Sequence, residues 1–281
     1  MIHHDLVQKN AMPMMTIMQV VLNAEKITGQ RRLNNAIHGR QMPCIKRNSV
    51  YNQPLHLGGL DEEHRPFVSL FCGGCAIEAK VKADIKICND IHPYLIAMWK
   101  GLQNGWTPPD AVSKEEYQYI KAHKDENPAL TGFVGFGCSF GGKWFGGYAH
   151  DKRGDDYCGQ AKRGVMRDYC GEAKSTTAKD LTGLKSATFI CGDYRDVVIP
   201  EHSVVYADPP YEKSTKYSTG DFDHTAFWSY MRQLAKQGHR VFISEEHAPD
   251  DFMCIWHKEK IRTLKKDDNV NMVRTERLWT I

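Results

Sequence analysis

The stretch PFVSLFCGGC, residues 66–75, followed by IKICND, residues 85–90, decides the fold class of this chain. Each stretch begins as a short apolar run typical of a strand. The first run closes on Gly73-Gly74 and the second on Asn89-Asp90. A helix is expected next, because apolar residues recur at helical spacing over 91–102. The order of strand, glycine turn, helix, strand, acid and helix is the one with which a doubly wound α/β sheet opens.

Residues 107–185 interrupt this pattern with a segment rich in glycine and aromatic residues, including GFVGFG at 132–137 and GGKWFGGY at 141–148. Such glycine density disfavours long regular elements, so we interpret the segment as an inserted lobe or a set of loops. Beyond it, strands are expected at 187–191, 203–207, 240–244, around 254–256 and at 277–281, with a helix at 224–237. The predicted organisation is therefore a divergent amino-terminal segment (1–60), an α/β domain (61–106 and 186–281) and an inserted region (107–185).

The composition favours a soluble globular protein over a disordered or membrane protein. Hydrophobic residues make up 41% of the 281 residues and charged residues 25%. Polar residues interrupt the longest mainly apolar stretch, 11–24, so no membrane span is expected. The formal net charge of +3 permits a nucleic-acid partner without requiring one.

The cysteines indicate reduced thiols and no metal site. The chain has 9 of them, an odd number, and several lie in strand-like apolar runs. Cys72 and Cys75 form a CxxC pair, but a zinc ribbon needs a second such pair at a suitable distance, and the sequence has none.

The residues richest in chemical information are Asp208-Pro209-Pro210-Tyr211, which directly follow the apolar run 203–207. Two prolines end a strand abruptly and hold the preceding residue extended. A carboxylate, a proline carbonyl and an aromatic face are thus expected together at the carboxyl end of a strand, where open α/β sheets bind ligands. Two acceptors and a stacking ring suit the exocyclic amine of a base.

Three further strand-end sites are expected at the same sheet edge. The turn Phe71-Cys72-Gly73-Gly74 lets the backbone approach a cofactor closely. Asp90 ends the second strand, where an acid can accept hydrogen bonds from ribose hydroxyls. Asp193 follows the strand at 187–191.

Together, Asp208-Pro209-Pro210-Tyr211 and Phe71-Cys72-Gly73-Gly74 resemble the motifs of the Dam-like, D12 class of DNA N6-adenine methyltransferases. The resemblance runs from about residue 65 to 281, and 89–100 and 132–147 look close to a phage or prophage branch. It implies a Rossmann-like S-adenosylmethionine-dependent methyltransferase fold with an inserted DNA-recognition lobe. It also implies double-stranded DNA as partner, S-adenosylmethionine as cofactor, no metal, and the cytoplasm of a bacterial host cell.

The resemblance assigns roles to individual residues. Cofactor-binding residues would be Phe71, Cys72, Gly73 and Gly74 on the methionine part, Asp90 on the ribose and Asp193 at the adenine end. The catalytic residues would be Asp208, Pro209, Pro210 and Tyr211, with the first two on the target amine and Tyr211 stacked on a flipped base.

The inserted region is the expected DNA reader. Lys143, Arg153, Lys162 and Arg163 are candidates for phosphate contacts, and Trp144, Phe145 and Tyr148 for wedging or stacking. Aspartates lie among the basic residues, so the local excess of positive charge is small.

Two departures from the family pattern stand out. Ser69-Leu70 replaces the acidic residue that usually precedes the Phe of the glycine motif, and Gln30 stands where a lysine near the amino terminus is usual. Alternatives remain open: N4-cytosine methylation, RNA or a glutamine amide as target, or a catalytically degenerate phage remnant that binds DNA.

Overall fold

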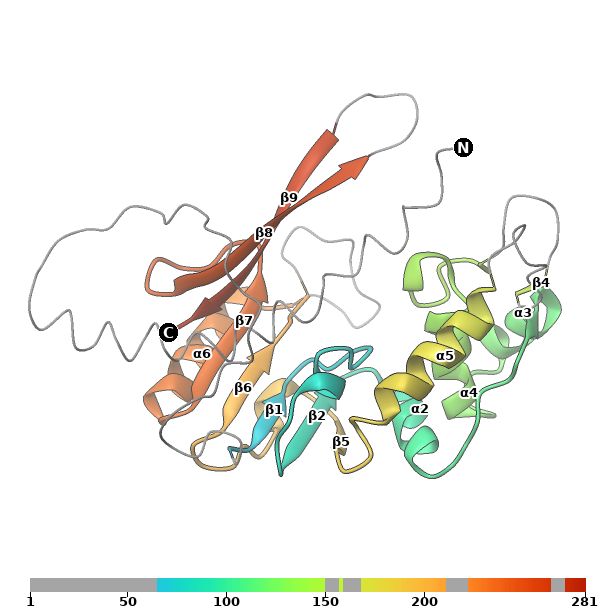
Figure 1. Ribbon diagram of the computed structural model, residues 1–281, viewed down its shortest axis with the longest axis horizontal. Coiled ribbons are helices and arrows are strands. Elements are labelled where there is room, and N and C mark those ends of the chain that lie inside the picture. Colours follow the sequence, from blue (N-terminus) through green and yellow to red (C-terminus); the bar gives the residue numbers. More distant parts are fainter. Residues whose placement is uncertain (1–64, 150–156, 159–167, 211–221, 264–270) are drawn as a thin grey trace, which may run out of the picture.

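The computed structural model describes residues 65–149, 157–158, 168–210, 222–263 and 271–281, and it confirms the predicted α/β class. Helices and strands are mixed along the chain, which ends in three consecutive strands (Figure 1). The strands are β1 (Phe67–Ser69), β2 (Lys86–Asp90), β3 (Val112–Ser113), β4 (Tyr157–Cys158), β5 (Thr188–Cys191), β6 (Val204–Ala207), β7 (Arg240–Glu245), β8 (Met253–Thr263) and β9 (Asn271–Thr280). The helices are α2 (Pro93–Gln103), α3 (Lys114–Ala122), α4 (Pro128–Gly137), α5 (Tyr169–Leu181) and α6 (His224–Lys236), with the 3₁₀ turns η3 (Glu78–Lys80), η4 (Phe140–Gly142) and η5 (Tyr194–Asp196).

The main sheet has seven strands in the order β5-β2-β1-β6-β7-β9-β8. The first five are parallel, and β9 and β8 continue the sheet as an antiparallel pair. Within the sheet, the chain enters at β1 and continues outward through β2 to β5. It then crosses back to β6, which lies on the other side of β1. The strand order thus reverses between the paired strands β1 and β6, which makes this position a topological switch point. Open α/β sheets bind ligands at such a point, at the carboxyl ends of the strands.

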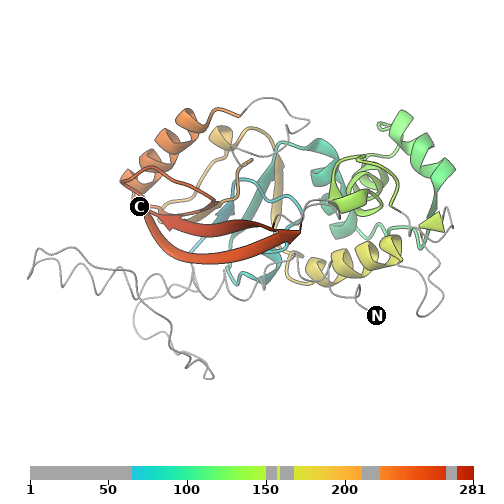
Figure 2. The same cartoon turned by 90° about the horizontal axis from the view of Figure 1, so that it is seen from above.

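Both faces of the sheet are covered, because successive side chains of a strand point to opposite faces. On one face, Val68, Val205 and Val241 pack against the apolar stripe of α6, whose Phe227 and Met231 are fully buried. Figure 2 shows α6 running along one side of the sheet. On the other face, Cys88 and Phe189 pack with α2 and the inserted helices.

The connection from β1 to β2 differs from expectation. A helix was expected there, and the structure has only the three-residue turn η3. Residues 70–85 join the two strands, and the glycine turn and the extended segment from Val81 take most of them.

The described part of 107–185 contains the helices α3, α4 and α5, so its glycine content does not exclude regular elements, contrary to expectation. α4 contains Gly132, Gly135 and Gly137, and helix formation there follows from Asn127, whose side chain caps the first turn, and from Pro128 at the start. A Cβ on Gly132 would lie 2.0 Å from the Tyr94 carbonyl oxygen of α2. These glycines therefore permit close contact between helices.

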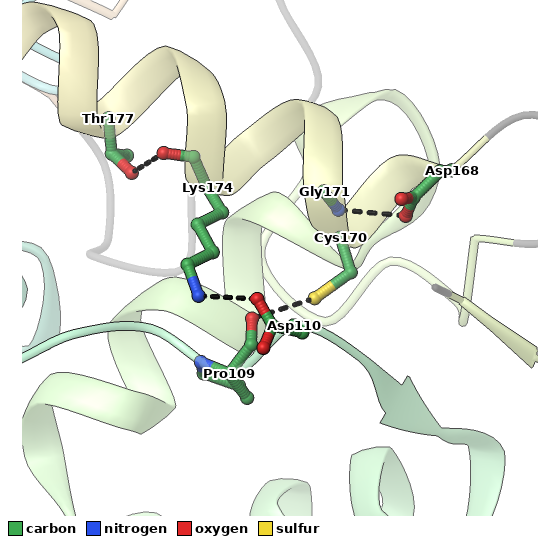
Figure 3. A network of polar contacts seen from close by, with 7 residues as sticks. All are labelled: Pro109, Asp110, Asp168, Cys170, Gly171, Lys174 and Thr177. Carbon is green, nitrogen blue, oxygen red and sulfur yellow. Dashed lines mark hydrogen bonds and ion pairs between the residues drawn. The ribbon is translucent and has the colours of Figure 1, made fainter. Parts of the chain in front are cut away.

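Helix α5 is tied to the chain that follows α2 (Figure 3). Asp168 caps α5 by accepting a hydrogen bond from the Gly171 amide at 2.8 Å. Lys174 forms an ion pair with Asp110 at 2.6 Å, and the Cys170 thiol donates to the Pro109 carbonyl. An ion pair and hydrogen bonds thus hold α5 in place in addition to the apolar core.

The last two strands are much longer than the short strands expected around 254–256 and 277–281. β9 pairs with β7 only over Arg277–Thr280, whereas β8 and β9 stay paired as far as Thr263 and Asn271. The extra length projects from the sheet as a two-stranded ribbon (Figure 1). It extends past Glu245, the last residue of β7, and therefore beyond the edge at which the parallel strands end.

Candidate active site

Four parallel strands end side by side and bring together the polar residues that the sequence analysis singled out. Ser69, at the end of β1, is in register with Cys88 of β2 and Tyr206 of β6. Asp90 of β2 is in register with Cys191 of β5. Phe71, Asp90, Asp193 and Asp208 therefore all lie at one edge, because each ends or directly follows one of these strands.

The glycine turn is held open above this edge. The Cys72 amide donates to the Asn89 carbonyl at 2.7 Å, and the Trp99 indole donates to the Gly73 carbonyl at 3.2 Å. Gly73 has a φ of 45°, which favours glycine. A Cβ placed on Gly73 or Gly74 would meet no atom of the described residues within 4 Å, so these residues leave the backbone of the turn accessible.

Asp90 and Asn89 stabilise the same turn from below. One oxygen of Asp90 accepts from the Gly73 amide at 2.9 Å and the other from the His92 amide at 2.9 Å. The Asn89 side chain, 1% exposed, donates to the Leu70 and Gly192 carbonyls and so bridges the ends of β1 and β5. Its Oδ1 atom is buried and has no hydrogen-bond partner within the described part of the chain.

Asp193 has a different local role from Asp90. It caps η5, and Arg195 binds its two oxygens with both contacts at 2.8 Å. The hydrogen bonds from Arg195 lower the pKa of Asp193. Any contact of Asp193 with a ligand has to share these oxygens with Arg195. Beside it, the Tyr194 and Phe71 rings pack together with their centroids 5.1 Å apart and form an apolar wall of the site.

Asp208 and the two prolines follow β6 directly. Ala207 is the last residue of the strand, Asp208 is exposed and Pro209 is buried. The carboxylate is thus presented at the edge by a rigid, anchored segment. Tyr211, the last residue of the motif, lies outside the described residues.

Glu78 is a residue of this site that the sequence analysis missed. It lies on η3, is only 2% exposed, and accepts a hydrogen bond of 2.6 Å from the Ser69 hydroxyl. Burial raises the pKa of Glu78 to about 7, and the nearby Asp208 charge acts in the same direction. A signal was present in the sequence: Glu78 is the only acidic residue of 65–83 and stands between Ile77 and Ala79.

The inserted region meets the DNA-contact expectation only in part. Lys143 is exposed, but Phe145 and Tyr148 are buried in the core, so their expected wedging or stacking on DNA is wrong. Trp144 is half-buried. Its ring centroid lies 4.2 Å from that of His92 and 5.4 Å from that of Tyr94, on which it stacks. Arg153, Lys162 and Arg163 lie outside the described residues.

Cys72 and Cys75 are buried free thiols in the core beneath the glycine turn. The pKa of the Cys72 thiol is raised to about 12, with burial and the Glu78 charge among the causes. Within the described part of the chain, no group of three or more His, Cys, Asp or Glu side chains could hold a metal ion, and no helix is long and apolar enough to cross a membrane.

Comparison with known proteins identifies the class that this geometry resembles. Residues 58–131 match the model of the D12 class N6 adenine-specific DNA methyltransferases. The match confirms the resemblance to this class over the glycine turn, Asp90, α2 and the start of α4, and it ends before Asp208. The phage or prophage branch remains a prediction.

A relative and a solved structure add to this comparison. The chain is 27% identical over 99 residues to the type II methyltransferase M.MjaIII of Methanocaldococcus jannaschii, covering 31% of this chain and 34% of that protein. It thus spans about a third of the length of the curated relative that it matches. The rRNA methyltransferase aviRa from Streptomyces viridochromogenes aligns with a TM-score of 0.32 and 11% identity over 77% of this chain and 76% of its own.

Proposed function

We propose that this protein is a DNA methyltransferase that transfers a methyl group from S-adenosylmethionine to the N6 amino group of adenine. The observation that carries the proposal is the placement of Asp208-Pro209-Pro210 beside the glycine turn, at the edge formed by the segment that matches the D12 class model. A catalytic domain with an inserted recognition region fits the two parts of the fold.

The residues at the edge fit the proposed cofactor. No atom of the described residues lies within 4 Å of a Cβ built on Gly73, Gly74 or Gly192, which permits close approach of a cofactor to the backbone. The half-buried Asp90 carboxylate is suited to ribose hydroxyls, and the Phe71 ring offers an apolar wall to the methionine chain. The unpartnered Oδ1 of Asn89 adds an acceptor beneath the same turn. Asp193 would contact the adenine end while still bound to Arg195.

When bound, the cofactor supplies a methyl group that is already activated by its sulfonium, so positioning is the main task left to the protein. Asp208 and the Pro209 carbonyl would accept hydrogen bonds from the target amine and stabilise its growing positive charge. Pro209 and Pro210 would fix these acceptors so that they need no reorganisation. Tyr211 would stack on the base, which has to leave the duplex before its amine can be reached.

DNA contact would come from the inserted region. Of the basic candidates named above, Lys143 lies within the described residues and is exposed. Arg153, Lys162 and Arg163 are proposed for the phosphates on sequence grounds alone. Trp144 would contact DNA only on the part of its ring that His92 and Tyr94 leave uncovered.

The proposal is tested by incubating the protein with radiolabelled S-adenosylmethionine and unmethylated duplex DNA, then digesting the DNA to nucleosides. Label in N6-methyladenine is the expected result. Label in N4-methylcytosine would show that the target is cytosine and not adenine, with the same mechanism of transfer to an exocyclic amine. Binding of DNA with no binding of S-adenosylmethionine at micromolar concentration would identify a degenerate remnant and overturn the proposal. Sequencing DNA from a methylation-free host that expresses the protein would give the recognition sequence.

A further inference from the structure

Glu78 is a buried carboxylate close to the edge where the parallel strands end. The Ser69 hydroxyl fixes it at 2.6 Å, and Ser69 is itself the last residue of β1, in register with Tyr206 of β6. Asp208 follows Tyr206 by two residues, and its charge reaches Glu78. Glu78 thus places a second carboxylate beneath a site that already presents Asp208.

A buried carboxylate costs stability when it ionises, so its presence in a core calls for an explanation. Hydrogen bonds from the Ser69 hydroxyl and from the backbone of Ile77 and Glu78 lower the pKa of Glu78, but burial outweighs them, and among the described residues the nearby charged groups give no close ion pair. Lys86 of β2 is within electrostatic reach, but its ammonium donates to the Gly183 carbonyl at 2.7 Å. Cys72 and Cys75 of the glycine turn and Asp208 beyond β6 add no positive charge. On the α5 side, Asp180 is within electrostatic reach of Lys80 of η3 and of Lys179, which lower its pKa against the effect of burial.

A cation bound at the edge would relieve the repulsion between Glu78 and Asp208. Charges in a protein interior interact more strongly than charges at the surface, because little water screens them. The two ligands of the proposed reaction differ in this respect. S-adenosylmethionine carries a sulfonium cation, whereas the product S-adenosylhomocysteine has a neutral thioether in its place and is otherwise the same apart from the methyl group.

We propose that Glu78 is a specificity-determining residue, whose buried negative charge makes the site prefer the cationic methyl donor over its neutral product. The inference rests on the proposed use of S-adenosylmethionine. Loss of the methyl group and its charge would then weaken binding of the product and favour its release. Ser69 is the positioning residue that keeps Glu78 in place.

The test measures the dissociation constants of both ligands by calorimetry at pH 6 and pH 8 for the wild type and Glu78→Gln. Because the pKa of Glu78 is about 7, its carboxyl is mostly neutral at pH 6 and mostly charged at pH 8. The wild type should therefore prefer the donor more strongly at pH 8. Glu78→Gln should lose about tenfold of that preference at pH 8 and show little change at pH 6.

Two further variants separate a charge effect from structural damage. Asp84→Asn removes an exposed acid from the same connection between β1 and β2 and should leave the preference unchanged. Ser69→Ala keeps the carboxylate but removes a hydrogen bond that lowers its pKa, so the pH at which the preference appears should move upward.

Equal weakening of both ligands in Glu78→Gln would show a structural role and overturn the inference. A Ser69→Ala profile identical to that of the wild type would also contradict it. If the wild-type protein binds neither ligand, it is the proposed function that fails.

Discussion

Asp208 is the residue on which the proposed chemistry depends most directly. Its exposed carboxylate follows β6 and is not part of the turn that would hold the cofactor. We expect Asp208→Ala to reduce methyl transfer by at least about 100-fold, the usual loss on removing one preorganised group that stabilises a transition state. Cofactor affinity should stay nearly unchanged. Single-turnover transfer and a ligand titration on the same sample check both parts, and near-normal turnover would remove Asp208 from the mechanism.

Tyr211 carries a prediction that comes from the sequence alone. If its ring stacks on the flipped base, Tyr211→Ala should weaken the DNA complex by about 1–3 kcal/mol, whereas Tyr211→Phe should be nearly silent. DNA with 2-aminopurine at the target position reports the stacking. Its fluorescence should brighten more with Tyr211→Ala than with the wild type. Equal brightness, together with a lowered melting temperature, would instead make Tyr211 a packing residue.

Glu78 should make stability depend on pH. Burial raises its pKa from 4.5 to about 7, so between these values the unfolded chain ionises Glu78 while the folded protein keeps the proton. The stabilising contribution is complete below pH 4.5 and is lost by about pH 7, in total about 3 kcal/mol. Urea unfolding of the wild type and Glu78→Gln at pH 4.5 and 7.5 measures this difference. A gap between the two proteins that is constant with pH would contradict it.

At the scale of elements, the contact between α2 and α4 is set by glycine. An added Cβ on Gly132 would lie 2.0 Å from the Tyr94 carbonyl oxygen, so the two helices would have to separate. We expect Gly132→Ala to destabilise the protein by about 1–3 kcal/mol, although alanine is the better helix former. Gly74→Ala is the matched control, since a Cβ there meets nothing within 4 Å. In thermal melts it should retain wild-type stability, and comparable melting of both variants would refute the close-contact explanation.

At the scale of the whole molecule, the inserted helices and the sheet share one core. A single cluster of buried side chains joins Cys88 of β2 and Phe189 of β5 to Tyr117 of α3 and Phe133 of α4. Unfolding the insertion alone would therefore expose one face of the sheet. We expect a single calorimetric transition, and Phe133→Ala, costing about 3–5 kcal/mol, should lower its midpoint. Two separate transitions, with only one of them shifted, would show that the insertion unfolds independently.

The sequence by itself determined the parallel part of the sheet and the residues at its edge. Short apolar runs that end in Gly73-Gly74, Asp90 and Asp208 carry both the strand signal and the polar side chains, because each strand and its carboxyl-terminal turn are contiguous in the chain. The helices at 93–103 and 224–236 were predictable for the same reason, since their apolar spacing and their stops are local.

Only the tertiary structure decided the features that depend on contacts between distant segments. The glycines of α4 disfavour a helix in isolation, but Gly132 permits the close approach to α2, and Gly135 and Gly137 permit close packing of Trp144 and Ala173. Phe145 and Tyr148 are aromatic residues of the kind that can stack on nucleic acids, yet they are buried in the folded protein. Glu78 belongs to the site only because the turn between β1 and β2 folds it onto Ser69. Local periodicity carries no information on such contacts, because burial and charge environment are set by neighbours that lie far away in the chain.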